Sequence, residues 1–321
     1  MNIIIKEIHK KDKSAIKSLI AKNKYNPYAN LGFYRDVDRL NNYYYGLFFA
    51  GRNIKVLSAI HRNEIVGLLT FSISKWDSEV FGMKMAKLGY ITAIGNYAVE
   101  LAVKSKLIDN AIKHLRKQNT KHLLIRVASN DFSSIHALEN NGFKIMDNLL
   151  TFILRERRII FPEVERWFKV KKITKGELES AGDILTNSNF VGHYFVDPMI
   201  PVLKAKRMYR KWLEDKYEHP KDSDILVAKR RNKIVGCSFF SFNNLLKKYT
   251  GLETLHRGLI AVDPSAKGCS IALINAQIKR RKNLDFAEFE TQTYNYGMMD
   301  IIQRLNMRLI RSRYTFHKVI K

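Results

Sequence analysis

The stretch of the chain that decides the fold reads Leu259-Ile260-Ala261-Val262-Asp263-Pro264-Ser265-Ala266-Lys267-Gly268-Cys269-Ser270-Ile271-Ala272-Leu273. An apolar strand ends at an Asp-Pro pair, a loop with a lysine and a glycine follows, and a helix begins directly after it. A helix N-terminus presents unpaired backbone N–H groups and partial positive charge, and small residues let a phosphate approach the backbone. This order predicts an anion site, with Lys267 as a fixed positive charge. A purely structural strand-loop-helix remains an equal alternative for the loop taken alone.

Length and composition limit the class of protein. The 321 residues are enough for two domains of about 150 residues, each with its own core. No apolar run reaches the roughly 18 residues that span a bilayer. The apolar run at the N-terminus is too short for a signal peptide, because a charged residue, Lys6, already follows Ile5. The two cysteines, Cys237 and Cys269, form no disulfide framework and no metal-ligand spacing. We therefore expect a cytoplasmic protein with no metal and no membrane span.

The net charge is strongly positive, because 56 Lys and Arg outnumber 30 Asp and Glu to give +26. Such a charge suits nucleic acid or an anionic membrane surface, but it also steers small phosphate-bearing ligands. The basic residues are dispersed, with the tightest cluster at 279–282, and no zinc-finger, RNP-type or leucine-zipper pattern accompanies them. Nucleic acid is therefore a possible partner but not the favoured one.

The two halves of the chain repeat each other. Apolar strands after a polar turn occur at 64–71 and 233–240, and strand-helix-strand patterns begin at 123–127 and 287–293. The offset is 169 residues between Gly67 and Gly236 and 165 between Asn130 and Asn295. A nearly constant offset between elements in the same order indicates a duplicated domain rather than a solenoid.

Each half is predicted to be an α/β (α+β) domain, with a mixed, mostly antiparallel sheet flanked by helices. We place the domains at 1–157 and 165–321, with a linker near 155–162, where a charge run and a proline follow a strand. The first half has no basic-glycine loop after 89–97, and a helix over about 99–117 follows instead. We therefore expect the first half to be a degenerate copy that serves as a scaffold.

The loop resembles the acetyl-CoA loop of the GNAT acetyltransferases, with Lys267 in place of an arginine, then Gly268, Ser270 and Ala272. Three more stretches resemble tandem-GNAT enzymes of the dTDP-fucosamine acetyltransferase type, which acetylate the amine of a dTDP-linked amino sugar. They are Trp76–Gly82, His193–Pro198 with an amphipathic helix after it around Lys204–Lys216, and the terminal strand Arg311–Lys318.

The resemblance implies a tandem GNAT fold, acetyl-CoA as acyl donor and a nucleotide-linked amino sugar as the anionic acceptor. Cofactor binding would then involve Ile260, Ala261, Val262, Lys267, Gly268, Cys269, Ser270, Ile271, Ala272 and Asn295. Backbone N–H groups of 259–262 would serve the thioester carbonyl, and Asn295 would contact CoA, although a plain helix cap explains Asn295 equally well. Acceptor binding would involve Asp77, Glu79, His193 and Asp197, although local turn capping explains a Trp-Asp-Ser segment equally well.

The general acid of the reaction is the weak point of the resemblance. GNAT enzymes commonly use a tyrosine four residues before the Gly-Phe of the last helix, and the two positions here hold Leu138 and Ile302. Neither side chain donates a proton. The candidates that remain for catalysis are Tyr294, Tyr314 and His317, each with packing as its alternative role.

Two other functions stay open. One is a catalytically weak or inactive binding protein that keeps the duplicated fold, which Ser270 and Ile302 favour. The other is a tandem-GNAT aminoacyl transferase that uses charged tRNA, which the charge of +26 favours. An enclosed basic pocket at Lys267 would indicate CoA, whereas a continuous basic face would indicate tRNA. A homodimer is compatible with all three.

Overall fold

A computed structural model describes residues 2–8, 13–49, 53–155, 167–190, 192–220, 223–281 and 283–320. The chain forms two compact units. Unit 1 comprises residues 1–149 together with 311–321, and unit 2 comprises residues 150–310. The predicted linker lies mostly outside the described residues, since 156–166 are not among them.

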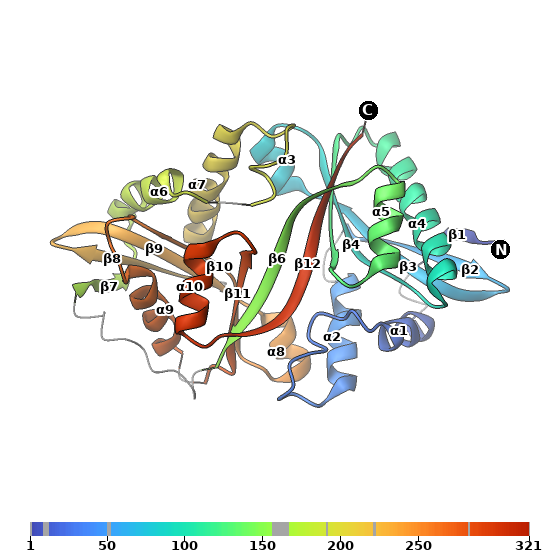
Figure 1. Ribbon diagram of the computed structural model, residues 1–321, viewed down its shortest axis with the longest axis horizontal. Helices are drawn as coiled ribbons and strands as arrows, with labels where there is room; N and C mark the ends of the chain where they lie inside the picture. The colour runs from blue at the N-terminus through green and yellow to red at the C-terminus, as the bar shows by residue number, and fades with distance from the viewer. Residues whose placement is uncertain are drawn as a thin grey trace. The chain divides into compact units, whose positions relative to one another are not determined.

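Unit 1 contains a sheet in the order β1-β2-β3-β4-β5-β12, in which only β4 and β5 pair in parallel. Its core lies between this sheet and the helices that follow β4 and β5. Its elements are β1 (Ile4–Glu7), α1 (Lys13–Lys22), α2 (Val37–Phe49), β2 (Lys55–His61), β3 (Glu64–Ile73), α3 (Lys75–Phe81), β4 (Met85–Ala93), α4 (Tyr97–Lys117), β5 (His122–Ala128), α5 (Phe132–Asn140), the start of β6 (Lys144–Leu154) and most of β12 (Arg308–Val319) (Figure 1).

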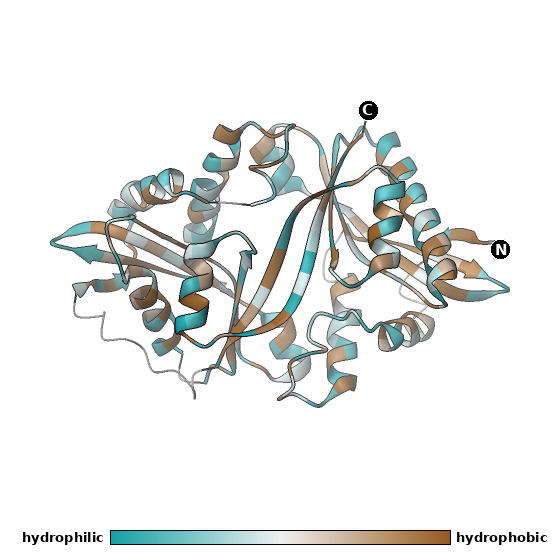
Figure 2. Ribbon diagram, in the orientation of Figure 1, coloured by the Kyte–Doolittle hydropathy of each residue, from teal (hydrophilic) through white to brown (hydrophobic). Residues whose placement is uncertain are grey.

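Unit 2 repeats this plan with the strand order β11-β10-β9-β8-β7, in which only β10 and β11 pair in parallel. Its elements are β7 (Lys169–Lys172), a 3-10 turn (Lys175–Glu177), α6 (Leu178–Asn187), α7 (Val202–Glu218), β8 (Ser223–Arg230), β9 (Lys233–Phe242), α8 (Asn244–Thr250), β10 (Thr254–Val262), α9 (Cys269–Lys279), β11 (Phe286–Gln292) and α10 (Tyr296–Arg304). Helices α6 and α7 carry hydrophobic and hydrophilic residues on different sides, as helices with one buried face do (Figure 2).

Backbone geometry confirms the internal repeat. The turn between β2 and β3 has φ of 48° and 65° at Arg62 and Asn63, and the turn between β8 and β9 has the same values at Arg231 and Asn232. Helices α3 and α8 both end at a left-handed glycine. The offset of 169 residues therefore holds from strand to helix, and both units have the mixed, mostly antiparallel sheet that the sequence predicts.

The C-terminal strand differs from the predicted division of the chain at 165–321. Residues 313–319 of β12 pair antiparallel with β5, and Phe316 is fully buried in the core of unit 1. The physical reason is that β12 places alternate apolar side chains on the inner face of the unit 1 sheet, where they bury more surface than an exposed terminal strand would. Residues 311–321 therefore belong to unit 1.

No helix in the described part of the chain is long and apolar enough to cross a membrane.

Candidate functional site

The central feature of unit 2 is an opening between its two parallel strands. β10 pairs with β11 only at Thr254–Phe286 and Leu255–Ala287, although the strands continue to Val262 and Gln292. Past these two pairs the ladder ends, so the β10 backbone groups that would bond β11 are available to another partner. An extended chain inserted here could be bound by the backbone N–H groups of β10.

A bulge bends β10 where this opening begins. The β9–β10 register shifts between His256 and Leu259, which places one extra residue in β10. A Cβ on Gly258 would lie 2.3 Å from the ring of Phe240, so only glycine fits at the bulge. The bulge therefore depends on Gly258, which directly precedes the strand-loop-helix stretch 259–273.

The loop after β10 is held by its aspartate. The backbone N–H of Asp263 donates to the Val235 carbonyl at 2.8 Å, and the Asp263 carboxylate accepts the N–H and hydroxyl of Ser265 at 2.9 and 2.7 Å. These hydrogen bonds from Ser265 lower the pKa of the Asp263 carboxyl. Gly268 then adopts φ of 86° directly before α9, a conformation in which glycine is not strained.

Backbone donors gather at the start of α9. The N–H of Cys269 donates to the Ala266 carbonyl at 3.0 Å. Within the described residues, the N–H groups of Lys267, Gly268, Ser270 and Ile271 donate to no backbone acceptor. Lys267 is exposed, whereas Gly268 and Ser270 are half-buried. The arrangement fits an anion, because unpaired N–H groups, a helix N-terminus and a lysine lie in one loop.

The remaining predicted cofactor residues of this stretch turn their side chains into the core. Cys269 packs against β9, where a Cβ on Gly236 would lie 2.6 Å from its sulfur, and burial raises the pKa of its thiol to about 12. Ile271 and Ala272 are buried in two different core clusters; Ile260 packs against both clusters and Val262 against that of Ala272. Ala261 is buried as well, whereas Ile260 and Val262 are half-buried.

Asn295 caps α10. Its side-chain oxygen accepts the N–H of Met298 at 3.3 Å, and its structural counterpart in unit 1 is Asp131, one residue after the Asn130 expected from the sequence. The predicted contact of Asn295 with CoA stays a prediction. Tyr294, beside it, is partly exposed. Ile302 is 4% exposed in the core of unit 2, so the usual place of the acid is filled by a packed aliphatic side chain.

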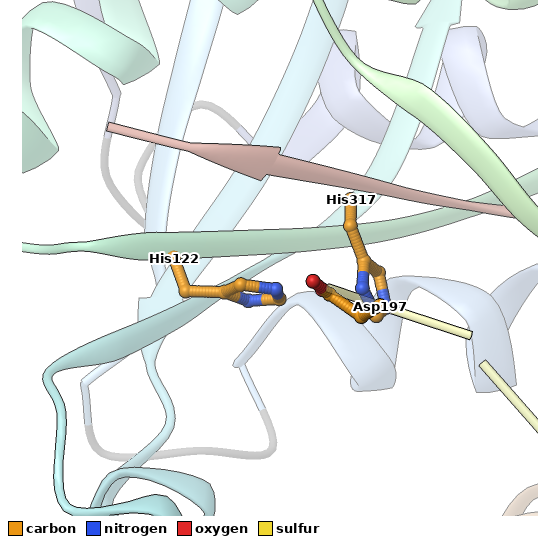
Figure 3. A group of neighbouring side chains, drawn as sticks. All are labelled: His122, Asp197 and His317. Atoms are coloured by element: carbon orange, nitrogen blue, oxygen red, sulfur yellow. The ribbon is translucent and has the colours of Figure 1, made fainter. Parts of the chain in front are cut away.

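Two of the three predicted catalytic residues lie in unit 1, not with the loop. Tyr314 packs against the core of unit 1. His317 is buried beside His122 of β5, with ring centroids 4.7 Å apart in an edge-on arrangement (Figure 3). The sequence did not single out His122, because its only signal was a lone histidine at the start of a strand.

The predicted acceptor residues are divided between the units. In unit 1, Asp77 of α3 is buried, accepts the Ser74 hydroxyl and pairs with Lys87 at 2.5 Å, whereas Glu79 is exposed. In unit 2, half-buried His193 lies against Tyr194, with ring centroids 4.0 Å apart and ring planes tilted by 45°.

Asp197, also drawn in Figure 3, belongs to unit 2. It is buried, and its carboxylate accepts the N–H of Met199 at 2.8 Å. Asp77 and Asp197 thus both have local structural roles.

A cavity of about 560 Å³ in unit 2 adjoins the loop and was not predicted from the sequence. The 3-10 turn and α6, the adjoining ends of β8 and β9, and the segment 262–264 line it. They bring carboxylates and lysines to it: Glu177, Asp183, Lys229, Lys233 and Asp263. Burial raises the pKa of Glu177, but hydrogen bonds from Lys171, Lys229 and Thr174 lower it by more, so the net pKa is about 2. The residues that line the cavity come from three segments far apart in the chain, so no local sequence motif indicates the cavity.

In unit 1, the position that corresponds to the loop before α9 is occupied by the first turns of α4. Val103 packs on Gly67 as Cys269 packs on Gly236, but α4 begins at Tyr97, six residues before Val103, whereas α9 begins at Cys269 itself. Helix therefore replaces the loop in unit 1.

A buried ion pair stands at the same place. Lys104, which follows Val103 as Ser270 follows Cys269, donates to Asp131 at 2.7 Å and to Ser133 at 2.8 Å. The ring of Tyr25, from the segment between α1 and α2, lies 5.7 Å from the Lys104 ammonium. A lysine that is already paired with a carboxylate offers little to an incoming phosphate.

No protein-family model and no curated protein sequence match the chain. Solved structures do. One is a GCN5-related N-acetyltransferase from Sphaerobacter thermophilus, with 13% identity and a TM-score of 0.64 over 99% of this chain and 96% of that one. Another is a tandem GNAT protein from the clavulanic acid biosynthesis pathway, with 11% identity and a TM-score of 0.57 over 99% and 98%. The chain therefore has the fold of the GCN5-related N-acetyltransferases, in a tandem arrangement.

Proposed function

We propose that unit 2 is an N-acetyltransferase that binds acetyl-CoA through the loop 267–272 and acetylates the amine of a nucleotide-linked amino sugar. One observation carries the donor half of this proposal. The unpaired N–H groups and Lys267 stand at the end of the opening between β10 and β11, so one ligand with a diphosphate and an extended arm would occupy both.

The chemistry needs a neutral amine and a polarised thioester. The amine lone pair attacks the thioester carbonyl carbon, the C–N bond forms and the C–S bond breaks. The amine nitrogen loses one proton and the departing thiolate takes one up, so the products are the amide and the free CoA thiol. Backbone N–H groups of β10 would stabilise the oxyanion of the tetrahedral intermediate. Tyr294 is the candidate acid in this unit, and water is the alternative.

The acceptor would bind in the cavity beside Asp263. Its carboxylates suit an amine, and its exposed lysine, Lys233, suits a phosphate. A nucleotide-linked amino sugar carries both groups, and a net charge of +26 favours anionic ligands in general. Unit 1 would be the scaffold, since its own Lys104–Asp131 pair fills the place of the anion loop.

The test of donor binding is calorimetric titration of the full chain with acetyl-CoA. Lys267→Glu should weaken binding by about 1–3 kcal/mol, because it replaces a phosphate partner with a repelling charge. Lys279→Glu, at the other end of α9, is the matched control and should change affinity little, because the charge then lies far from the anion site. Equal losses in both variants would contradict the proposed loop.

The acceptor is tested by the release of free thiol with a set of nucleotide-linked amino sugars. Tight acetyl-CoA binding with no thiol release on any amine would favour the second candidate, a GNAT-fold binding protein. The buried position of Ile302 is the observation that supports it, because no phenol stands there and a tyrosine would overpack the core. Transfer from charged tRNA without use of acetyl-CoA would instead support the aminoacyl transferase.

A further inference from the structure

An exposed apolar group of residues lies in unit 2, in the segment just before α7 and in the first turn of α7. It consists of Val196, Met199, Val202 and Leu203, whose exposed fractions run from 49% to 70%. Single exposed apolar side chains are ordinary on protein surfaces, but four within eight residues form a patch. Figure 2 shows the same hydrophobic character in the first turn of α7. This patch has no role in the proposed acetyl transfer.

The patch is held in one conformation. The Asp197 carboxylate accepts the N–H of Met199, and its carbonyl accepts the N–H of Ile200 at 3.0 Å. Ile200 is buried, and Pro198 and Pro201 restrict the backbone on either side of it. The apolar side chains therefore lie on a preformed turn, so the segment loses little conformational entropy when these side chains bind a partner.

The charges of α7 run against its helix dipole. Five basic residues occupy its first ten positions (Lys204, Lys206, Arg207, Arg210 and Lys211), and acidic residues come after them (Glu214, Asp215 and Glu218). The first turn holds Lys204 and no acidic residue, and the last turn holds Lys216 beside its carboxylates, so the helix dipole does not favour the charge of the first turn. Arg210 pairs with Asp183 and Lys211 with Asp215, but Lys206 and Arg207 form no ion pair within the described residues.

We propose that the segment 196–207 docks on an anionic lipid bilayer. Its apolar side chains would enter the boundary between headgroups and acyl chains, while Lys206 and Arg207 would contact lipid phosphates. Charge complementarity supports this occupant, because the whole chain carries +26 and the apolar patch adjoins Lys206 and Arg207 in the sequence. The patch is aliphatic, so it lacks the aromatic rings on which the bases of a nucleic acid would stack.

The test is flotation of the full chain with vesicles of phosphatidylcholine alone and with about 30% phosphatidylglycerol, a content that gives a negative surface potential. We expect binding to the anionic vesicles only, with a loss at high salt. Met199→Ser/Leu203→Ser and Lys206→Glu/Arg207→Glu should each weaken binding about tenfold or more. The control variants Ile145→Ser/Leu309→Ser and Lys113→Glu change exposed apolar and basic residues elsewhere and should bind like the parent chain.

Several results would overturn the proposal. They are no binding to anionic vesicles, equal binding to neutral vesicles, or equal losses in the control variants. Tighter binding to nucleic acid that Lys206→Glu/Arg207→Glu removes would assign the basic end of α7 to that partner instead. A dimer in solution that Met199→Ser/Leu203→Ser converts to monomer would assign the patch to a second copy. Unchanged thermal unfolding and acetyl-CoA affinity of the variants would show that the fold and the proposed transferase site are intact.

Discussion

Asn295 and Asp131 cap equivalent helices with nearly the same backbone angles, φ and ψ of −85° and 73° against −90° and 72°. Both side-chain oxygens accept an N–H three residues on. Only the aspartate adds a negative charge, and that charge is the partner of Lys104. The cap of α10 in unit 2 is therefore neutral, whereas the charged cap of α5 in unit 1 forms a buried ion pair with Lys104.

The two roles of Asn295 are separable by substitution. Asn295→Ala should lower the free energy of unfolding by about 1 kcal/mol through loss of the cap. Asn295→Asp keeps the cap, as Asp131 shows, and should restore stability while still weakening acetyl-CoA binding. Chemical denaturation and titration calorimetry measure the two quantities. If Asn295→Asp binds acetyl-CoA like the parent chain, Asn295 is a structural cap only.

Lys104 is a buried cation that neutralises the buried carboxylate of Asp131. Lys104→Met should lower the free energy of unfolding by about 3–5 kcal/mol, since Asp131 would keep a buried charge. Lys113→Met, on the exposed side of the same helix, should change it by less than about 0.5 kcal/mol. Urea denaturation measures both. If Lys104→Met lowered the free energy of unfolding only slightly, Asp131 would have to be stabilised by another partner.

At the scale of elements, the 3-10 turn that precedes α6 begins with a capping box. Thr174 donates its N–H and hydroxyl to Glu177 at 3.0 and 2.9 Å, and Lys171 and Lys229 approach the other carboxylate oxygen at 2.8 and 2.6 Å. This one carboxylate therefore joins the helix start to β7 and β8 and forms part of the cavity wall.

The stability that Glu177 contributes should depend on pH. Its folded-state pKa of about 2 lies below the ordinary 4.5, so the ionised form stabilises the fold above about pH 4.5, and the contribution disappears as the pH falls toward 2. Glu177→Gln should lower the free energy of unfolding at neutral pH on the order of 1–3 kcal/mol, with a difference from the parent chain that shrinks below pH 4.5. Denaturation from pH 7 to 3 measures this difference. Glu179→Gln, an exposed neighbour, should show no such dependence.

At the scale of the whole molecule, the last strand of the chain completes the unit that the first residues begin. Phe316 of β12 should therefore matter to unit 1 despite its place near the C-terminus. Phe316→Ala should lower the free energy of unfolding by about 3–5 kcal/mol. Hydrogen exchange should rise first in β4 and β5, not in α9. Faster exchange confined to unit 2 would contradict the assignment of residues 311–321.

The sequence predicts much of the fold because the signals of its elements are local. The strand at 233–240, the helix at 204–216 and the strand-loop-helix at 259–273 lie inside elements of the structure. The repeat was readable because equivalent turns need equivalent residues, as at Gly67 and Gly236, where a helix side chain leaves no room for a Cβ. The candidate site was predicted only in part, since the loop is contiguous but the cavity beside it is not.

By itself, the sequence determined the duplicated α/β plan, the helix start after Gly268 and the missing phenol at position 302, because each depends on residues adjacent in the chain. Only the tertiary structure decided that Tyr314 and His317 belong to unit 1, that the Cys269 thiol is buried and Asp77 pairs with Lys87, and that Lys104 and Asp131 form an ion pair in unit 1. These outcomes depend on burial and on pairing between residues far apart in the chain. A motif specifies which side chains are present, whereas long-range packing specifies which of them a ligand can reach.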